Sequence, residues 1–139
     1  MRRKVRIILA AICLLAGTVV FAACGGAHSE SWRMASGHST RRLGNGFAVT
    51  VGSARSGQVN RTYTLNEAEL ASIHVHSHMG SGEIVLVISQ NGEEDGTEIV
   101  VNVSGHFNSI IDASHLNPGR IRFSLRLDEV RNTDTTITW

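Results

Sequence analysis

Three histidines alternate along one short stretch, Ile73-His74-Val75-His76-Ser77-His78. In a β-strand every second side chain points to the same face, so the three imidazoles would lie about 6.5–7 Å apart on one face. Neighbouring imidazoles of a His-x-His pair can bind one zinc or copper ion, for which imidazole is a preferred ligand. His74, His76 and His78 are therefore the candidate metal ligands. The alternative is a solvent-facing polar stripe.

A metal site here needs a further ligand, because the first and third histidines are too far apart to share an ion easily. The candidates for that ligand are His106, His115, Asp112 and Glu83, and the spacing does not select among them. Protonation near pH 6 would make the three imidazoles repel one another, so pH sensing is a related hypothesis.

Other chemistry-bearing clusters favour simpler explanations. The acidic stretch Glu93-Glu94-Asp95-Gly96, followed by Glu98, lacks the alternating oxygen ligands of an EF-hand and is typical of a solvated turn. Asp112, Ser114 and His115 are the residue types of a catalytic triad, but triads assemble from separated positions. No Gly-x-Ser-x-Gly elbow occurs. We therefore predict no catalytic residues and a protein that is not an enzyme.

The histidine stretch leads into the most apolar segment after the N-terminus, Gly82 to Gln90. Its five consecutive aliphatic residues, four of them β-branched, favour a strand. Ile84, Leu86 and Ile88 would point to one face, with Val85 and Val87 on the other. Both faces need apolar cover, which predicts a central strand.

Further strands are expected over residues 46–51, 59–65, 72–78, 98–103, 121–128 and 135–139, with one helical turn at 66–70. Residues 52–57 are typical of a loop, and Met79-Gly80-Ser81-Gly82 of a hairpin connection. Seven or eight short strands without helical periodicity predict a small antiparallel β-sandwich, jelly-roll or Greek-key-like. A small β-barrel is the alternative.

The N-terminus predicts export. Residues 1–6 carry four positive charges, and the 17 residues from Ile7 to Ala23 are uncharged, as in a secretory signal. A retained membrane anchor is the alternative. Phe21-Ala22-Ala23-Cys24-Gly25-Gly26 resembles a bacterial lipobox, although an aliphatic residue is usual where Phe21 stands. This resemblance implies that Cys24 becomes the N-terminus and carries lipid such as palmitate.

The predicted organisation is a signal peptide over residues 1–23, a flexible tether over 24–45, and a β-sandwich domain over 46–139. Cleavage removes four basic residues and leaves nine arginines against twelve acidic residues, a net charge of −3. That balance gives no electrostatic case for nucleic acid. We expect a lipid-anchored protein on the extracytoplasmic face of the cell membrane.

The strand and turn pattern includes a strand ending in Tyr63-Thr64-Leu65, an apolar strand ending in Ile88-Ser89-Gln90, and a final strand ending in Trp139. It resembles small, functionally uncharacterised β-sandwich lipoproteins of Gram-positive bacteria. That family has no assigned catalytic residues to carry over to this sequence.

Three functions remain open. The first is a non-catalytic binding or structural domain whose partner is a protein or the cell wall. The second is a zinc- or copper-binding surface protein using His74, His76 and His78; otherwise no cofactor is expected. The third is a cell-wall glycan-binding module. Most aromatic residues are in phase with core positions, which leaves few of them to stack on a sugar. Arg41-Arg42, Arg122 and Arg126 are candidates for binding anionic polymers or lipid headgroups. The alternative is that they are solvent-exposed arginines on the faces of strands.

Overall fold

The computed structural model describes residues 28–90 and 98–139. Almost all of this part of the chain is β-structure, and every pairing between the named strands is antiparallel. The strands are β1 (His28–Arg33), β2 (Ser39–Leu43), β3 (Gly46–Leu65), β4 (Ile73–Gln90), β5 (Glu98–Val103), β6 (His106–Ile111) and β7 (Gly119–Thr138), with one short helix, α2 (Glu67–Leu70). Within these ranges no helix is long and apolar enough to cross a bilayer.

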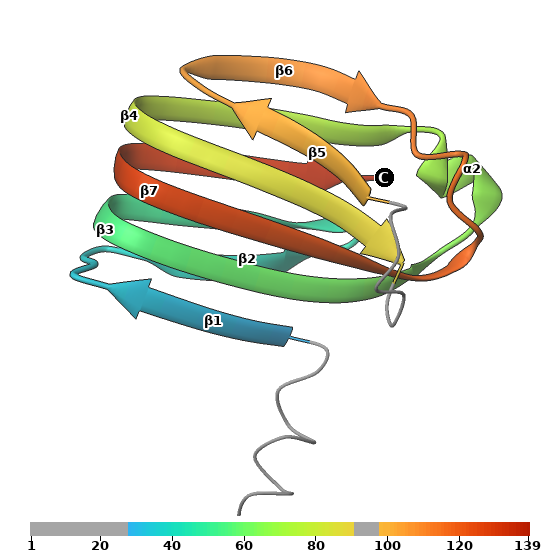
Figure 1. The fold of residues 1–139 in the computed structure, drawn as a ribbon, viewed down its shortest axis with the longest axis horizontal. Helices are drawn as coiled ribbons and strands as arrows, with labels where there is room; N and C mark the ends of the chain where they lie inside the picture. The colour runs from blue at the N-terminus through green and yellow to red at the C-terminus, as the bar shows by residue number, and fades with distance from the viewer. Residues whose placement is uncertain (1–27, 91–97) are drawn as a thin grey trace, which may run out of the picture.

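Three long strands build both layers of the fold. β7 lies between β3 and β4 and pairs with each of them over most of its length. All three strands turn over near their middles, so that their two halves lie in different layers (Figure 1). One layer has the order β2-β3-β7-β4-β6 and the other β1-β3-β7-β4-β5. In the described residues the outer strands do not pair with one another, so the sheet is not closed into a barrel. The predicted antiparallel β-sandwich is confirmed.

The turn-over of the long strands defines one end of the sandwich, which we call the bend end. Gly82 has φ +100° there, and the β4–β7 register shifts between Ser81 and Glu83. A Cβ on Gly82 would lie 2.5 Å from the carbonyl oxygen of Glu129, so β7 approaches too closely for a side chain. The opposite end, with α2 and the C-terminus, is the open end (Figure 1).

Two predicted loops are therefore wrong. Residues 79–82 do not form a hairpin, since β4 continues through them and its halves enter different layers. Residues 52–57 likewise lie within β3. Glycine-rich sequence suits a bend inside a strand as well as a reversal of the chain, and the two cannot be told apart by composition.

The core lies between the layers and follows the predicted alternation. Ile84, Leu86 and Ile88 are buried, and this half of β4 lies between β7 and β5 as a central strand. Val85 and Val87 are only half-buried, so the second face has partial cover. The remaining large, fully buried side chains come mainly from the other long strands: Phe47, Val49, Leu65, Leu70, Ile73, Ile121, Phe123, Leu125 and Ile137.

The predicted tether is wrong for residues 28–43, because β1 and β2 lie there and pair with the two halves of β3. These are short polar strands at the edges of the layers, and none of their residues is fully buried. Edge strands of this kind carry little hydrophobic periodicity. The predicted helical turn is confirmed: Asn66 caps α2, and its side chain accepts a hydrogen bond from the Glu69 amide.

Candidate functional site

The three predicted metal ligands lie exposed on the outer face of β4, on one side as expected. The structure does not group them with each other. His74 Nε2 is 2.6 Å from Asn108 Oδ1, and His78 Nδ1 is 3.1 Å from His106 Nδ1. Across residues 28–90 and 98–139, no three His, Cys, Asp or Glu side chains are already placed to hold a metal ion.

Of the candidate further ligands, His106 alone is in contact with a histidine of β4. Asp112 and His115 lie between β6 and β7, where Asp112 Oδ1 accepts a hydrogen bond from the Ser114 amide at 2.9 Å. Hydrogen bonds from Ser114 lower the pKa of the Asp112 carboxyl. This segment is thus a local turn. Glu83 is exposed at the bend end. Cys24 and residues 93–95 lie outside the described residues.

The two predicted arginines of β7 line a shallow hollow of about 290 Å³ on the outer face of the β5-containing layer. Ser124 lies between them and donates a hydrogen bond to Asn60 Oδ1 at 2.8 Å. Asn60 in turn donates to Ser29 Oγ at 2.9 Å. Ser124, Asn60 and Ser29 are thus hydrogen-bonded to one another across three strands. Arg122 Nε is buried and has no hydrogen-bond partner among the described residues.

A larger hollow, of about 470 Å³, lies at the open end. We call it the end pocket. Its lining comes from the two edge strands beside β3, from β3 itself, from α2 and from the residue after β7. The lining residues are His28 of β1, Arg42, Leu43, Gly44, Gly46, Thr62, Tyr63 and Thr64 of β2–β3, Glu69 of α2, and Trp139. Strands from both layers and the helix therefore meet around one cavity, whose size is within the range usual for ligand sites.

Aromatic rings form one part of the end pocket. Trp139 and Tyr63 are half-buried, with ring centroids 4.8 Å apart. The indole also stacks on buried Phe123, with centroids 5.4 Å apart and an interplanar angle of 11°. Asn45 holds the same residue, since its side chain donates to Trp139 O at 2.7 Å and its carbonyl accepts from Trp139 N at 3.0 Å. The indole is thus held in a fixed position while part of it remains accessible.

Polar groups form the rest of the end pocket. Thr62 is only 9% exposed, and its hydroxyl has no hydrogen-bond partner among the described residues. Burial raises the pKa of the Tyr63 hydroxyl, an effect that the positive charges of Arg61 and Arg42 oppose, so the phenol is a neutral hydrogen-bond donor. Exposed Arg42 and half-buried Glu69 complete the set. The Thr62 hydroxyl itself is buried, so a polar ligand would meet exposed groups of the lining such as Arg42.

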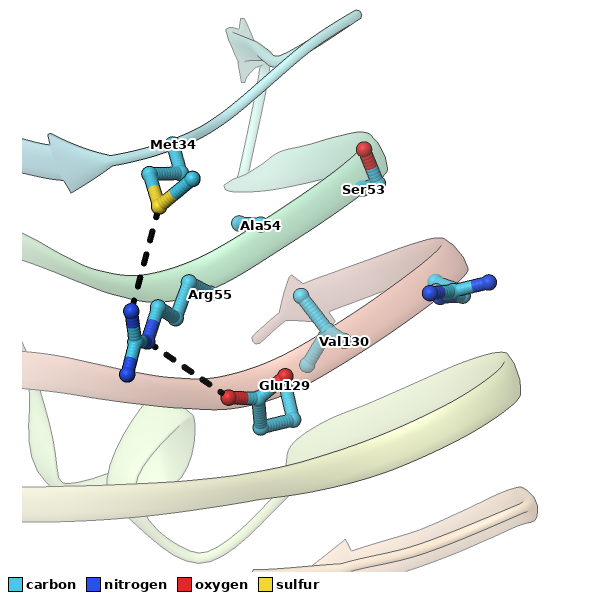
Figure 2. A pocket seen from close by; sticks show the side chains of 7 residues that line it. Met34, Ser53, Ala54, Arg55, Glu129 and Val130 are labelled. Carbon is cyan, nitrogen blue, oxygen red and sulfur yellow. Dashed lines mark hydrogen bonds and ion pairs between the residues drawn. The ribbon is translucent and has the colours of Figure 1, made fainter.

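The hollow at the bend end differs from the end pocket. Figure 2 shows it between Met34, Arg55 and Glu129. Its volume is about 350 Å³. Arg55 Nε lies 3.8 Å from Glu129 Oε1, and both side chains are more than half exposed. Aromatic residues are absent from its described lining. It offers one exposed ion pair and little else to a ligand.

Sequence reasoning missed the end pocket. Strand periodicity puts Tyr63 and Trp139 in phase with core positions, and both do pack on Phe123, but both also line the cavity. Arg42 was noted only as half of an arginine pair. The available signal was weak: a strand that ends on a large aromatic residue places its last ring at the rim of the core.

No protein-family model matches the chain, and no curated protein sequence matches it. Among solved structures, it is similar to the carbohydrate-binding module TmCBM61 in complex with β-1,4-galactotriose, with a TM-score of 0.50, 19% identity, and coverage of 80% of this chain and 83% of that one. The Drosophila melanogaster CENP-C cupin domain matches with a TM-score of 0.31, 17% identity, and coverage of 83% and 86%. At these identities the first likeness shows the β-sandwich fold alone, and the second TM-score carries no argument.

Proposed function

We propose that this protein is a non-catalytic binding protein of the bacterial cell envelope, and that its β-sandwich binds a glycan in the end pocket. The observation that carries the proposal is the pair of half-buried rings, Tyr63 and Trp139, with Arg42 and Glu69 in the same lining. Sugars present apolar C–H faces that pack on aromatic rings, and hydroxyls that exchange hydrogen bonds with polar side chains.

The charges of the end pocket favour a neutral ligand. Arg42 and Glu69 both line it, so the described lining carries one charge of each sign besides the titratable His28. A polyanion would meet the Glu69 carboxylate, whereas sugar hydroxyls can donate to that carboxylate and accept from the guanidinium. The ligand class we infer is a neutral oligosaccharide segment. The module of similar fold was solved with such a ligand, β-1,4-galactotriose.

Binding rather than hydrolysis follows from the number of carboxylates. Glycosidases generally use two carboxyl groups on either side of the scissile bond. Glu69 is the one carboxylate side chain in the described lining of the end pocket. It also accepts a hydrogen bond from the Asn66 amide at 2.7 Å as part of the helix cap. The described lining of the end pocket provides no second acid for the reaction.

The test is binding of the full chain to neutral oligosaccharides, β-1,4-galactan fragments and cell-wall polysaccharides, by a glycan array followed by calorimetry. We expect Trp139→Ala and Arg42→Ala each to weaken binding by about tenfold or more, which corresponds to about 1.4 kcal/mol. Trp32→Ala is the matched control, because Trp32 is a half-buried indole on a different hollow.

The proposal fails if the wild-type chain binds no glycan of the set, or if Trp32→Ala loses as much affinity as Trp139→Ala. Thermal melts of all variants separate loss of the site from loss of the fold. Tyr63→Phe adds a finer measurement, since it keeps the ring and removes the hydroxyl.

Anchoring is the second part of the proposal. It rests on the charged and apolar pattern of residues 1–23 and on the lipobox-like sequence before Cys24. We expect the wild-type protein in a bacterial host to fractionate with membranes and to incorporate labelled palmitate. Cys24→Ala should abolish the label. Persistent label in that variant would contradict lipidation at Cys24.

A further inference from the structure

We propose that His78 and His106 form a binding site for one divalent transition-metal ion, independent of the end pocket. The two residues face each other across β4 and β6, which pair antiparallel with His78 opposite His106. Directly opposed residues of an antiparallel pair point to the same face. Both side chains are exposed, so an ion can reach them from solvent.

The distance between the imidazoles suits a shared ion. Nδ1 of His78 lies 3.1 Å from Nδ1 of His106, and the ring centroids are 4.2 Å apart. Two bonds of about 2.0–2.1 Å from zinc to nitrogen, at an angle of about 90–110°, place the nitrogens about 2.9–3.4 Å apart. An ion can therefore bind both nitrogens with little movement of either ring.

At this distance a proton must lie between the two nitrogens when no metal ion is bound. Two lone pairs cannot face each other at 3.1 Å without repulsion, so in the free protein one Nδ1 carries a proton and donates it to the other. A metal ion takes the place of that proton. The displaced proton moves through solvent to the free Nε2 of the same ring, so both neutral imidazoles then carry their protons on Nε2 and no net proton is released.

The backbone holds the pair in register. The Met79 amide donates a hydrogen bond to the Gly105 carbonyl at 3.1 Å. This bond joins the residue after His78 to the residue before His106, next to the turn in which Gly105 has φ +58°. The approach of the two Cα atoms is thus fixed by the fold, so fewer degrees of freedom are lost on binding.

The surroundings favour a cation but do not close the site. Asp134 of β7 lies opposite His78 on its other side and is exposed, which places a negative charge beside the pair. Because the described residues contain no group of three ligands, water fills the remaining coordination positions. Two imidazoles with water suit Cu²⁺ and Zn²⁺, with Cu²⁺ bound more tightly.

The site differs from the His-x-His pair that the sequence suggests. His74 and His76 lie on the same strand and face as His78, but His74 contacts Asn108 instead. The cross-strand partner, and not the neighbour along the strand, is the second ligand. His76→Ala and His106→Ala distinguish the two arrangements.

The experiment is calorimetric titration of the untagged full chain with Zn²⁺ and with Cu²⁺. We expect one ion per chain at this site, and a loss of affinity of about tenfold or more in both His78→Ala and His106→Ala, since each removes one of two protein ligands. His74→Ala is the matched control and should change the affinity by less than about twofold. Electron paramagnetic resonance of the Cu²⁺ complex should show nitrogen coupling that both ligand variants weaken.

The proposal is overturned if the wild-type chain binds neither ion at concentrations up to about 100 μM, an affinity of about −5.5 kcal/mol. It is also overturned if His76→Ala abolishes binding while His106→Ala does not, or if His74→Ala loses as much affinity as His78→Ala. Thermal melts of the apo variants should match the wild type, because all of these side chains are exposed. Glycan binding should be unchanged in His106→Ala, so the two proposals fail independently.

Discussion

The two ends of the sandwich differ in the kind of contact that forms them. At the bend end, three continuous strands turn over one another, and backbone packs on backbone around Gly82. At the open end, strands stop, and side chains from β1, β2, β3, α2 and the C-terminus surround a cavity. Stability should therefore depend on backbone fit at one end, and binding on side chains at the other. The predictions below test that division, beginning with the largest effect.

Gly82→Ala should cause the greatest loss of stability. The new Cβ would meet backbone atoms of Glu129 and Val130 at 2.5–2.6 Å, and φ is +100°. We expect a loss of about 3 kcal/mol or more in the free energy of unfolding, measured by urea denaturation. Gly105→Ala is the control, because φ is +58° but the space is open; it should cost about 1 kcal/mol. Equal effects in the two variants would show that close packing at the bend is unimportant.

Asn45→Ala should weaken both stability and glycan binding at the open end. It removes the exposed hydrogen bond from the Asn45 side chain to Trp139 O. We expect a loss of about 0.5–1.5 kcal/mol in unfolding free energy, together with weaker glycan binding, because the indole is less well fixed. Calorimetry and denaturation of the same sample measure both. Unchanged glycan affinity would mean that Trp139 needs no such support.

The β1 edge should weaken in acid. Burial raises the pKa of Glu30, but the side chains of Thr40, Trp32 and Arg61 and the charge of Arg61 outweigh it, so the pKa is lowered from 4.5. The ionised form is thus favoured in the folded state. Its contribution to stability is present above pH 4.5 and is lost as the pH falls through the folded-state pKa.

Glu30→Gln measures this contribution. Denaturation curves of wild type and variant should differ most near neutral pH and converge in acid. A difference that stays constant from neutral pH down to about pH 2 would contradict the assignment to this carboxyl.

The smallest effect is expected from the ion pair of Figure 2. Arg55 and Glu129 are largely exposed, and such pairs contribute little after screening by solvent and salt. Arg55→Ala should change the unfolding free energy by less than about 0.5 kcal/mol. A larger loss would show that side chains as well as backbone stabilise the bend end.

The alternation of buried and exposed residues made the strands of the core predictable. Ile121, Phe123 and Leu125 alternate with polar residues in a strand buried on one face, and the structure has them there. The joins between strands were not predictable in the same way. Residues 79–82 carry two glycines, which fit a hairpin and a bend equally well, and only the pairing of β4 with β7 decides between them.

The candidate site was less accessible to sequence reasoning. The face of the histidines followed from strand periodicity, but the contact of His78 with His106 depends on the β4–β6 register. The end pocket joins residues as distant as His28 and Trp139. The proximity of these residues depends on where the ends of different strands lie in three dimensions, which no local sequence pattern encodes.

The position of β7 also governs when the protein can fold. It is the last strand along the described chain, yet it lies in the middle of both layers, and β3 reaches β4 only through it. Gly46 pairs with Thr138, so nearly the whole domain must be made before either layer is complete. Folding with such distant pairings is slow. The nascent chain therefore cannot complete either layer until β7 has been synthesised.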